Sequence, residues 1–359
     1  MTKLLILTSK LKKSGPNNVI KSLISGLKNQ HIDVYLSPLS KKYDIDYVDD
    51  LEIGENKIFF QRDLFSLLHL IRIINQIKPD CVNTHGIRAD FYLLILSFFY
   101  NFKIISTIHN VPTEDYFFRY NKFLANLMVF FHSFVFRNKK IIKVPVSYQV
   151  KKCLEGLDGV NLHVIYNGVS HNDFDPKAKL KSNSLKKDFD LGKNRKKILF
   201  CGHLVDLKDP LIVASIAPNF PEIDFIFLGD GYLKDRISDN DNDNDNVYVL
   251  GRVDNVCDYL LIADYYIMPS LTEGMPMALI EAMLMDLPVI CSNIPIFREI
   301  SKIENTSLFL FETSNRKELV SLVSEVINID GFLSNRSVAL KKFTSESMAK
   351  NYLGIINDK

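Results

Sequence analysis

Residues 268–283 read MPSLTEGMPMALIEAM, and this stretch decides the fold because it joins a strand to a helix through a tight turn. A short apolar strand is expected to end near Pro269, and a polar turn follows it. Pro276 is expected at the first position of the next helix, where its missing N–H costs nothing. Gly274, inside the turn, allows the backbone to approach a ligand closely. The pattern predicts a strand end that opens directly into a helix.

Backbone donors and two carboxylates gather at this expected helix start. The N–H groups that would point out of it belong to Met275, Met277 and Ala278, and the positive potential of a helix N-terminus suits phosphate or hydroxyl oxygens. Glu273 lies in the turn and Glu281 in the helix, eight positions on (281 minus 273). Because carboxylates accept hydrogen bonds from sugar hydroxyls, the pair could contact different parts of one extended ligand. The alternative is an ordinary turn with two exposed glutamates.

Short apolar runs alternate with amphipathic stretches along the 359 residues. Strands are expected at 4–7, 33–36, 57–60, 81–84, 103–108, 141–146, 163–166, 197–201, 225–228, 247–250, 265–268, 289–292 and 308–311. Helices are expected at 63–77, 89–100 and 121–137. Strands this apolar suit parallel sheets that helices cover on both faces. We therefore predict an α/β fold with two doubly wound parallel sheets in tandem.

A run of turn residues from Asn167 to Pro176, followed by a Lys- and Ser-rich stretch to about residue 196, interrupts this alternation. Turn residues followed by solvated charge are typical of a linker. We expect an N-terminal domain over 1–168 and a C-terminal domain over 177–340. Ligands of doubly wound sheets bind at the carboxyl ends of the strands, so the expected site is a cleft between the domains.

Composition and charge exclude several classes of function. The 44 basic and 42 acidic groups leave a net charge of +2, which gives no global attraction to nucleic acid, so we predict no nucleic-acid partner. The five cysteines stand singly, so buried thiols are expected rather than disulfides or zinc ligands. The apolar runs fall short of the ~20 residues that span a bilayer, so no transmembrane helix is expected. The Asp/Asn repeat at 238–246 is expected to be a surface loop without a function.

The strand–turn–helix stretch carries a resemblance to a known family. Residues 269–276 and 281–283, followed by 287–290, resemble the Glu-x7-Glu signature of glycosyltransferase family 4. Further matches span nearly the whole chain, at 14–18, 83–86, 107–110, 165–169, 198–204 with Lys208, 228–231 and 250–253. The resemblance implies the GT-B architecture, in which two Rossmann-like domains face each other across a cleft. It also implies that a final helix, 345–359, crosses back to complete the N-terminal, acceptor-side domain.

The resemblance implies catalytic roles for Glu273, His109 and Lys208. Lys208 would face the diphosphate and offset the charge that builds there as the glycosidic bond breaks, while Glu273 would hold the transferred sugar. His109 would sit near that sugar on the side of the first domain. Donor-binding positions would also include Gly15, His203, Arg252, Val253, Gly274, Met275, Pro276, Met277, Ala278 and Glu281, with Glu281 on the ribose and Arg252 and Val253 near the base.

Two departures from the family pattern change the expected balance of charge. His203 stands where the family usually has Arg, so a fixed cation is replaced by a group that is only partly protonated near neutral pH. Diphosphate stabilisation would then depend more on Lys208. Gly15 is followed by Pro16 where a second glycine is common, which puts backbone contact with phosphate there in doubt.

The resemblance implies a retaining enzyme that moves a hexosyl or N-acetylhexosaminyl group from a nucleotide-diphosphate sugar, with UDP-sugars favoured. The acceptor would be a glycan or a polyprenyl-linked oligosaccharide, as in bacterial O-antigen or capsule synthesis. No metal or other cofactor is expected, because cationic side chains and a helix end would neutralise the diphosphate. The expected location is the cytoplasm. The alternatives are a sugar-nucleotide 2-epimerase of the same architecture and a non-catalytic sugar-nucleotide-binding subunit.

Residues 116–140 mix aromatic side chains with cations. Such a helix could lie on an anionic membrane surface, which would place the protein peripherally on the inner face of the cell membrane. The alternative is a helix packed on the first sheet whose exposed side is basic. The sequence pattern leaves both interpretations open.

Overall fold

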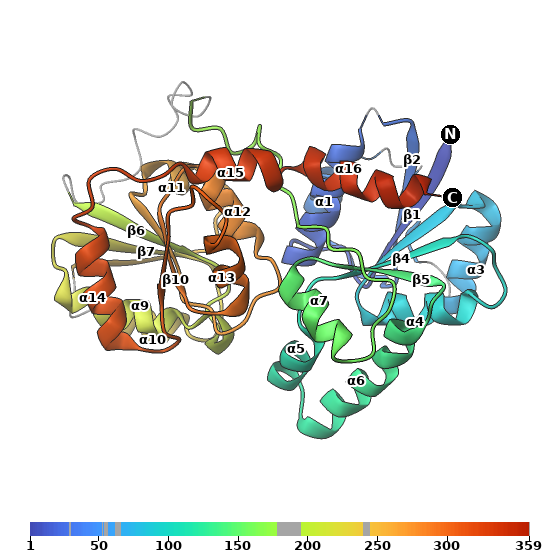
Figure 1. Ribbon diagram of the computed structural model, residues 1–359, viewed down its shortest axis with the longest axis horizontal. Helices are drawn as coiled ribbons and strands as arrows, with labels where there is room; N and C mark the ends of the chain where they lie inside the picture. Colours follow the sequence, from blue (N-terminus) through green and yellow to red (C-terminus); the bar gives the residue numbers. More distant parts are fainter. Residues whose placement is uncertain are drawn as a thin grey trace. The chain divides into compact units, whose positions relative to one another are not determined.

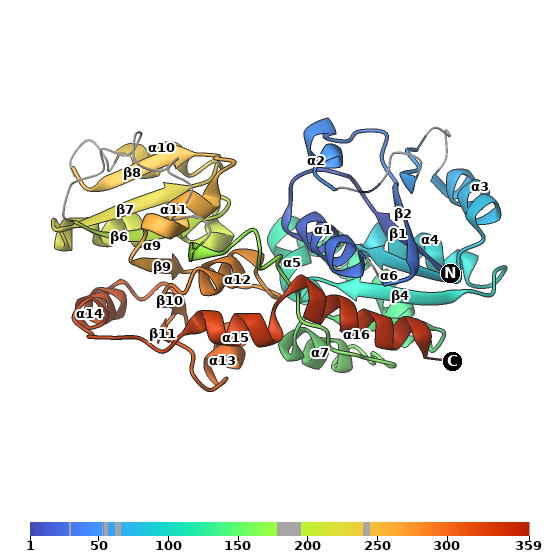
Figure 2. The same cartoon turned by 90° about the horizontal axis from the view of Figure 1, so that it is seen from above.

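The computed structural model describes residues 1–28, 30–51, 53, 57–61, 66–177, 195–239 and 245–358. The chain forms two compact units, one of Met1–Ser170 with Lys342–Lys359 and the other of His171–Lys341. Each unit is a parallel sheet with helices on both faces (Figure 1 and Figure 2). The predicted α/β fold with two doubly wound sheets is therefore confirmed. Most of the expected linker, 178–194, and the centre of the Asp/Asn repeat, 240–244, lie outside the described residues.

The first unit is built on a five-stranded sheet with the order β2-β1-β3-β4-β5. Its strands are β1 (Thr2–Thr8), β2 (Ile32–Pro38), β3 (Cys81–His85), β4 (Lys103–Ile108) and β5 (Ile141–Pro145). Its helices are α1 (Gly15–Leu27), α2 (Ile45–Asp49), α3 (Ser66–Ile77), α4 (Ile87–Leu96), α5 (Pro112–Arg119), α6 (Lys122–Arg137), α7 (Tyr148–Glu155) and α16 (Ser345–Asn357). A buried apolar cluster joins α3, α4 and α6 to one face of the sheet.

The C-terminal helix α16 packs on α1 in this same unit. The two helices touch backbone to backbone, because a Cβ added at Gly26 would lie 2.2 Å from the Ser345 carbonyl oxygen. Tyr352 of α16 also reaches the sheet, and its hydroxyl lies 2.7 Å from Thr107 Oγ1 of β4. The chain end thus covers the second face of the first sheet.

The second unit is built on a six-stranded parallel sheet with the order β11-β10-β9-β6-β7-β8. Its strands are β6 (Lys196–Cys201), β7 (Ile223–Leu228), β8 (Val247–Gly251), β9 (Tyr265–Met268), β10 (Val289–Ser292) and β11 (Leu308–Phe311). Its helical segments are η3 (Asp206–Lys208), α9 (Pro210–Ile216), η4 (Ala217–Asn219), α10 (Lys234–Asp239), α11 (Val256–Ile262), α12 (Met277–Leu284), α13 (Pro295–Ser301), α14 (Arg316–Val326) and α15 (Asn335–Lys342). Side chains of α9, α10 and α14 pack with alternate residues of β6 and β7 in one buried cluster.

Two of the predicted strands are wrong. In the 57–60 stretch, Ile58 forms a single isolated bridge to Leu36 of β2. Just before the 163–166 stretch, Leu162 forms an isolated bridge to Lys143 of β5. Within the stretch, only alternate amides bond to that strand, with His163 N 2.9 Å from the Lys143 carbonyl oxygen. Both stretches are apolar enough to read as strands, but each meets only the outer edge of a terminal strand, where too few bonds form for a continuous ladder.

Candidate active site

Four strand ends of the second unit share one edge of its sheet. Because β9, β6, β7 and β8 are parallel neighbours, the residues that follow them lie along the same edge. Most of the predicted donor-binding residues stand there: His203 and Lys208 after β6, Arg252 and Val253 after β8, and 273–278 after β9. This edge is where ligands of doubly wound sheets bind.

Lys208 and Glu273 form an ion pair between the loop after β6 and the turn after β9. Lys208 Nζ donates to Glu273 Oε1, and the same oxygen accepts a hydrogen bond from Ser270 Oγ at 2.8 Å. The two side chains are only 24% and 10% exposed, so water screens the pair weakly. A bond from the Leu271 amide to the Leu207 carbonyl, 2.9 Å, holds the two loops side by side. The sequence identified both charged residues but did not predict that they pair.

The residue after Lys208 fixes the direction of its loop. Asp209 adopts a left-handed conformation (φ 44°, ψ 48°), which aspartate tolerates better than most residues. Its carboxylate accepts a hydrogen bond from Ser314 Oγ at 3.0 Å. Burial raises the pKa of Asp209, and the Ser314 hydrogen bond opposes that rise. The turn ends η3 at Lys208 and starts α9 at Pro210, so the lysine stands at a defined corner.

The helix tip after β9 begins one residue later than predicted. Pro276 is the N-cap of α12, with an extended ψ of 127°, and Met277 takes the first helical position. The fixed φ of proline fits both positions, so the sequence did not distinguish them. The first-turn donors are therefore Met277 and Ala278, as predicted, while Met275 lies in the turn before the helix. Proline has no side-chain oxygen to cap these donors, which suits a tip that receives a ligand oxygen.

The charges of both glutamates act on a buried phenol of β9. Tyr266 of β9 is fully buried, and its hydroxyl donates to the Cys201 carbonyl at 3.1 Å. Burial raises the pKa of Tyr266 well above its ordinary value, and the Cys201 thiol and the carboxylates of Glu281 and Glu273 raise it further. Both glutamates thus lie near one phenol. The sequence reasoning missed Tyr266, because a tyrosine in an apolar strand gives no signal beyond core packing.

Glycines let the strand ends approach each other closely. Gly229, after β7, has φ +142°, and a Cβ there would lie 1.8 Å from the Gly202 carbonyl oxygen. A Cβ at Gly231 would lie 2.2 Å from the Leu204 carbonyl oxygen. The Gly229 amide also donates to the Gly251 carbonyl at 2.7 Å, so the ends of β6, β7 and β8 are linked backbone to backbone. The strand ends at this edge are therefore close-packed.

The remaining predicted donor residues differ in exposure. His203 and Arg252 are exposed, Val253 and Glu281 are half-buried, and Gly274 is buried with Met275, Pro276 and Met277. An exposed cation at the strand ends can move toward an anionic ligand, whereas the buried turn offers only its backbone.

In the first unit, two histidines meet where β3 and β4 end. His85 Nδ1 lies 2.8 Å from His109 Nε2, and the rings tilt 32° to each other. Burial lowers the pKa of His109 to about 4, and the charge of Asp90 opposes that shift. Burial, with the neighbouring His109, also lowers the pKa of His85 well below its ordinary range. Both imidazoles are therefore neutral at physiological pH.

The loop after β1 is organised by Asn17 rather than by Gly15. Asn17 is buried, and its amide donates to the carbonyls of Lys10 and Lys12, each at 2.7 Å, while its oxygen accepts from Thr8 Oγ1 at 3.0 Å. A Cβ at Gly15 would meet nothing within 4 Å. Gly15 thus opens α1 beside free space.

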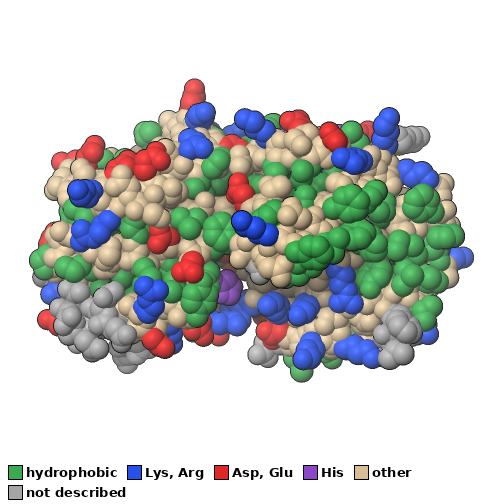
Figure 3. Space-filling view, turned by 90° about the horizontal axis from the view of Figure 1, so that it is seen from below, with side chains coloured by type: hydrophobic (Ala, Val, Ile, Leu, Met, Phe, Trp, Pro, Cys, Tyr) green, Lys and Arg blue, Asp and Glu red, His purple; other side chains and the backbone are tan. Residues whose placement is uncertain are grey.

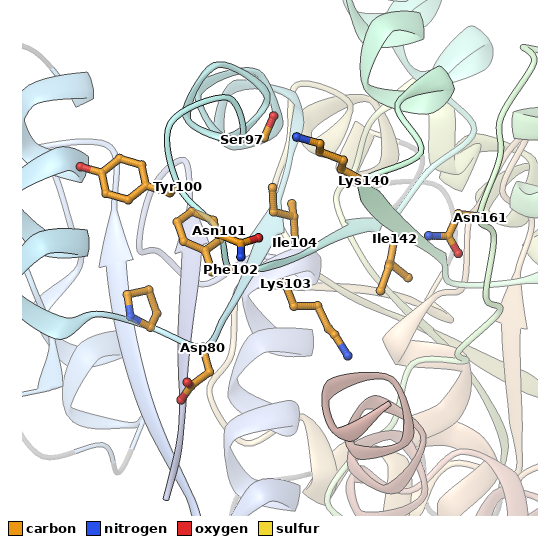
Figure 4. A pocket seen from close by; sticks show the side chains of 11 residues that line it. Asp80, Ser97, Tyr100, Asn101, Phe102, Lys103, Ile104, Lys140, Ile142 and Asn161 are labelled. Atoms are coloured by element: carbon orange, nitrogen blue, oxygen red, sulfur yellow. The ribbon is translucent and has the colours of Figure 1, made fainter. Parts of the chain in front are cut away.

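A hollow of the first unit lies away from the histidine pair. It holds about 560 Å³ and is lined at the amino ends of β4 and β5 by residues such as Tyr100, Lys103 and Lys140 (Figure 4). The histidine pair stands at the opposite, carboxyl edge of the same sheet. The ammonium of Lys103 donates to carbonyls at the end of α16, including Ile355 at 2.8 Å. Lys103, which lines the hollow, therefore anchors the C-terminal helix.

Among the described residues, no helix combines the length and apolar character needed to cross a membrane.

Both halves of the chain match known family models. Residues 13–173 match the model described as Glycosyltransferase Family 4, and residues 181–343 match Glycosyl transferases group 1. The O-antigen biosynthesis glycosyltransferase WclY of Escherichia coli is 26% identical over 366 residues, covering 99% of this chain and 98% of that protein. The UDP-Gal:alpha-D-GlcNAc-diphosphoundecaprenol alpha-1,3-galactosyltransferase of Escherichia coli is 26% identical over 302 residues, covering 78% and 76%.

A solved structure has the same fold. Anabaena Alr3699/HepE, crystallised with UDP and glucose, superposes with a TM-score of 0.80 at 16% identity, and the match covers 100% of both chains. The fold similarity confirms the predicted GT-B class of two parallel-sheet α/β units.

Proposed function

The chain belongs to glycosyltransferase family 4, and from that premise we propose that it transfers a hexosyl or N-acetylhexosaminyl group from a UDP-sugar to a glycan or lipid-linked acceptor. It is a transferase by its family and by its similarity to named glycosyltransferases. The observation that supports the donor site most is the pairing of Lys208 with Glu273 beside the tip of α12. A fixed cation, a carboxylate and backbone donors there offer partners to every polar part of a nucleotide sugar.

Each of these groups has a proposed partner on the donor. The ammonium of Lys208 would shift from Glu273 toward the diphosphate, whose negative charge grows as its bond to the sugar breaks. Glu273 and the amides of the α12 tip would then hold sugar hydroxyls, and Glu281 would accept from the ribose. The histidine His109 of the first unit would contact the sugar as a neutral hydrogen-bond donor, because burial keeps its pKa low.

We propose a retaining reaction by same-face displacement. The bond between the anomeric carbon and the diphosphate oxygen breaks, the acceptor oxygen bonds to that carbon on the same face, and the acceptor proton passes to the departing diphosphate. No carboxylate of this chain is assigned as a covalent nucleophile. Mass spectrometry of the enzyme trapped with a slow donor is expected to show no glycosyl adduct, and an adduct would exclude this mechanism.

The reaction is proposed to need no metal. Lys208, the exposed Arg252 and the α12 tip supply positive potential at one sheet edge. Activity is expected to persist in excess chelator, and loss of activity that added Mg²⁺ or Mn²⁺ restores would contradict this.

The proposed acceptor is a polyprenyl-diphosphate-linked glycan of a bacterial surface polysaccharide, such as an O-antigen or capsule. A relative named for a diphosphoundecaprenol acceptor and relatives named for O-antigen and capsule synthesis support it. Because such acceptors reside in the cell membrane and nucleotide sugars in the cytoplasm, the enzyme would work at the inner membrane face.

One experiment tests the function and separates the alternatives. A panel of UDP- and GDP-sugars is screened for a thermal shift, and the best donor is then incubated with and without a lipid-linked acceptor. Glycosylated acceptor, lost in Glu273→Gln and kept in the exposed control Glu304→Gln, is the expected result. Conversion of the donor without any acceptor would indicate a 2-epimerase, and binding without turnover would indicate a non-catalytic subunit.

A further inference from the structure

Helix α6 of the first unit exposes most of its aromatic side chains while it buries two polar ones. Its buried side holds His132 and Ser133 together with Ala125, Val135 and Phe136, and its other four phenylalanines face outward. The exposed fractions are 81% for Phe123, 56% for Phe130, 42% for Phe131 and 46% for Phe134. A surface helix normally buries its apolar stripe and exposes its polar one. The exposed phenylalanines of α6 therefore form an apolar surface that contact with an apolar partner would stabilise.

Buried polar contacts fix this orientation. His132 Nε2 lies 3.2 Å from Asp90 Oδ2 of α4, and His132 Nδ1 lies 2.9 Å from the hydroxyl of Tyr116 of α5. Asp90 Oδ1 in turn accepts a hydrogen bond from Ser106 Oγ of β4 at 2.6 Å. Rotating α6 to bury its exposed phenylalanines would break these hydrogen bonds and leave the polar groups of the network without their partners. The outward aromatics are thus held outside by the fold itself.

Neighbouring elements extend the apolar surface beyond α6. Phe98 and Phe99, which follow α4, are 74% and 78% exposed, and α5, which packs on α6, exposes Phe117 and Phe118. An apolar groove of about 410 Å³ runs between α4 and α6 and is lined by Phe91, Leu94, Phe98, Phe131 and Phe134, with Arg137 and Asn138 at its end. We call this surface of α4, α5 and α6 the aromatic face, and Figure 3 shows hydrophobic side chains gathered there among Lys and Arg. Scattered exposed apolar residues are ordinary, but a contiguous patch marks an interaction site.

The charge around the aromatic face selects among its possible occupants. Residues 116–140 contain five Lys or Arg and no Asp or Glu, and the nearest acidic residues of α5 are Glu114 and Asp115 in its first turn. Lys122, Lys139 and Lys140 are exposed, and Arg137 pairs with Asp158 at 2.9 Å. A symmetric dimer through this face would bring two basic rims together, which is unfavourable. An anionic lipid surface would attract the lysines at the edge of this face. The aromatic rings would insert at the boundary between the lipid headgroups and the acyl chains.

We propose that the aromatic face docks the first unit on an anionic bilayer, with the phenylalanines of α6 and the α4 end inserted among lipid headgroups and the lysines on lipid phosphates. This deepens the proposed action on a lipid-linked acceptor by naming the surface that meets the membrane. The docking itself needs neither donor nor acceptor, so its test is separate from that of the transfer reaction.

The test is vesicle flotation of the full chain without substrates. The wild type is expected to float with vesicles of equal parts phosphatidylcholine and phosphatidylglycerol, and to remain at the bottom with phosphatidylcholine alone or in high salt. The triple variant Phe123→Ser/Phe130→Ser/Phe134→Ser should lose binding, since removing each ring that inserts into the lipid weakens partitioning about tenfold. The variant Lys139→Glu/Lys140→Glu should lose the dependence on phosphatidylglycerol.

The matched control changes exposed apolar residues of the same unit outside the aromatic face. Ile45 of α2 and Leu68 of α3 are 65% and 56% exposed, so Ile45→Ser/Leu68→Ser should float like the wild type. Circular dichroism checks that every variant is folded. Wild-type protein that fails to float with the mixed vesicles, or a triple variant that floats as well as the wild type, overturns the proposal. So does a wild-type dimer on gel filtration that the triple variant converts to monomer, because a second copy would then cover the face.

Discussion

His85 Nδ1 lies 2.8 Å from His109 Nε2, so the ends of β3 and β4 carry two joined imidazoles. Within the described part of the chain, the other nitrogen of His85, Nε2, is buried and has no hydrogen-bond partner. Burying an unprotonated ring nitrogen without a partner costs less free energy than burying an N–H without an acceptor. We therefore infer that His85 Nε2 is unprotonated and that His85 Nδ1–H donates to His109 Nε2. This leaves His109 with its proton on Nδ1, ready to donate to a ligand.

His85 is therefore expected to position His109. In His85→Leu, kcat should fall about 10- to 100-fold while the KM for the donor stays nearly constant, because His109 loses the bond that sets its tautomer. His85→Gln, whose amide can still donate, should recover much of the rate. Steady-state kinetics with normal thermal unfolding curves for both variants is the measurement. Equal losses in Leu and Gln would leave His85 with a packing role only.

The same pair predicts acid sensitivity. The folded-state pKa of His109 is lowered from 6.5 to about 4 by burial, so the unfolded state binds more protons in that interval. Stability contributed by the neutral ring is full above about pH 6.5 and is lost as the pH falls toward 4, by about 3 kcal/mol. Urea unfolding across this range is expected to show the loss, and His109→Gln should reduce it. His163→Gln, which removes an exposed histidine, should leave the pH dependence unchanged.

The ion pair at the strand ends predicts a catalytic loss. Lys208→Met and Glu273→Gln should each lower kcat about 10²- to 10³-fold, because the charge on the diphosphate and the hold on the sugar matter most in the transition state. Lys302→Met and Glu304→Gln change exposed groups of the same unit and are the matched controls. If both site variants instead raised only KM, the pair would serve ground-state binding rather than catalysis.

Two glycines differ in the space around them, so alanine substitutions at these two positions are expected to change the stability of the protein in opposite directions. Gly229→Ala would place a Cβ 1.8 Å from the Gly202 carbonyl at φ +142°, so it should destabilise the second unit by about 2 kcal/mol or more and weaken donor binding. Gly354 lies in α16 with nothing within 4 Å of an added Cβ. Gly354→Ala should stabilise the protein by about 0.5–1 kcal/mol. Chemical denaturation measures both, and a neutral Gly229→Ala would mean that the β6 and β7 ends can separate cheaply.

The sequence by itself determined the fold class and most of the elements. Apolar runs of strand length, amphipathic spacing and the turn before α12 are local signals, since each reports backbone restriction or one-dimensional periodicity. The strand–turn–helix pattern pointed to Glu273, and the resemblance to family 4 added Lys208 and His109; the catalytic roles of all three stay predictions. The sequence misjudged Pro276 by one position and the stretches at 57–60 and 163–166, because a ladder depends on a partner strand that a local pattern does not contain.

Only the tertiary structure decided which of these residues meet. The order β9-β6-β7 brings Ser270 and Glu273 to Lys208, and the neighbours β3 and β4 join His85 to His109. Residues 116–140 could have been a packed helix or a membrane surface, and the buried contacts of His132 with Asp90 and Tyr116 turn the phenylalanines outward. Pairings and burial of this kind depend on strand order and helix rotation, which are set by the sum of many distant contacts rather than by any one segment.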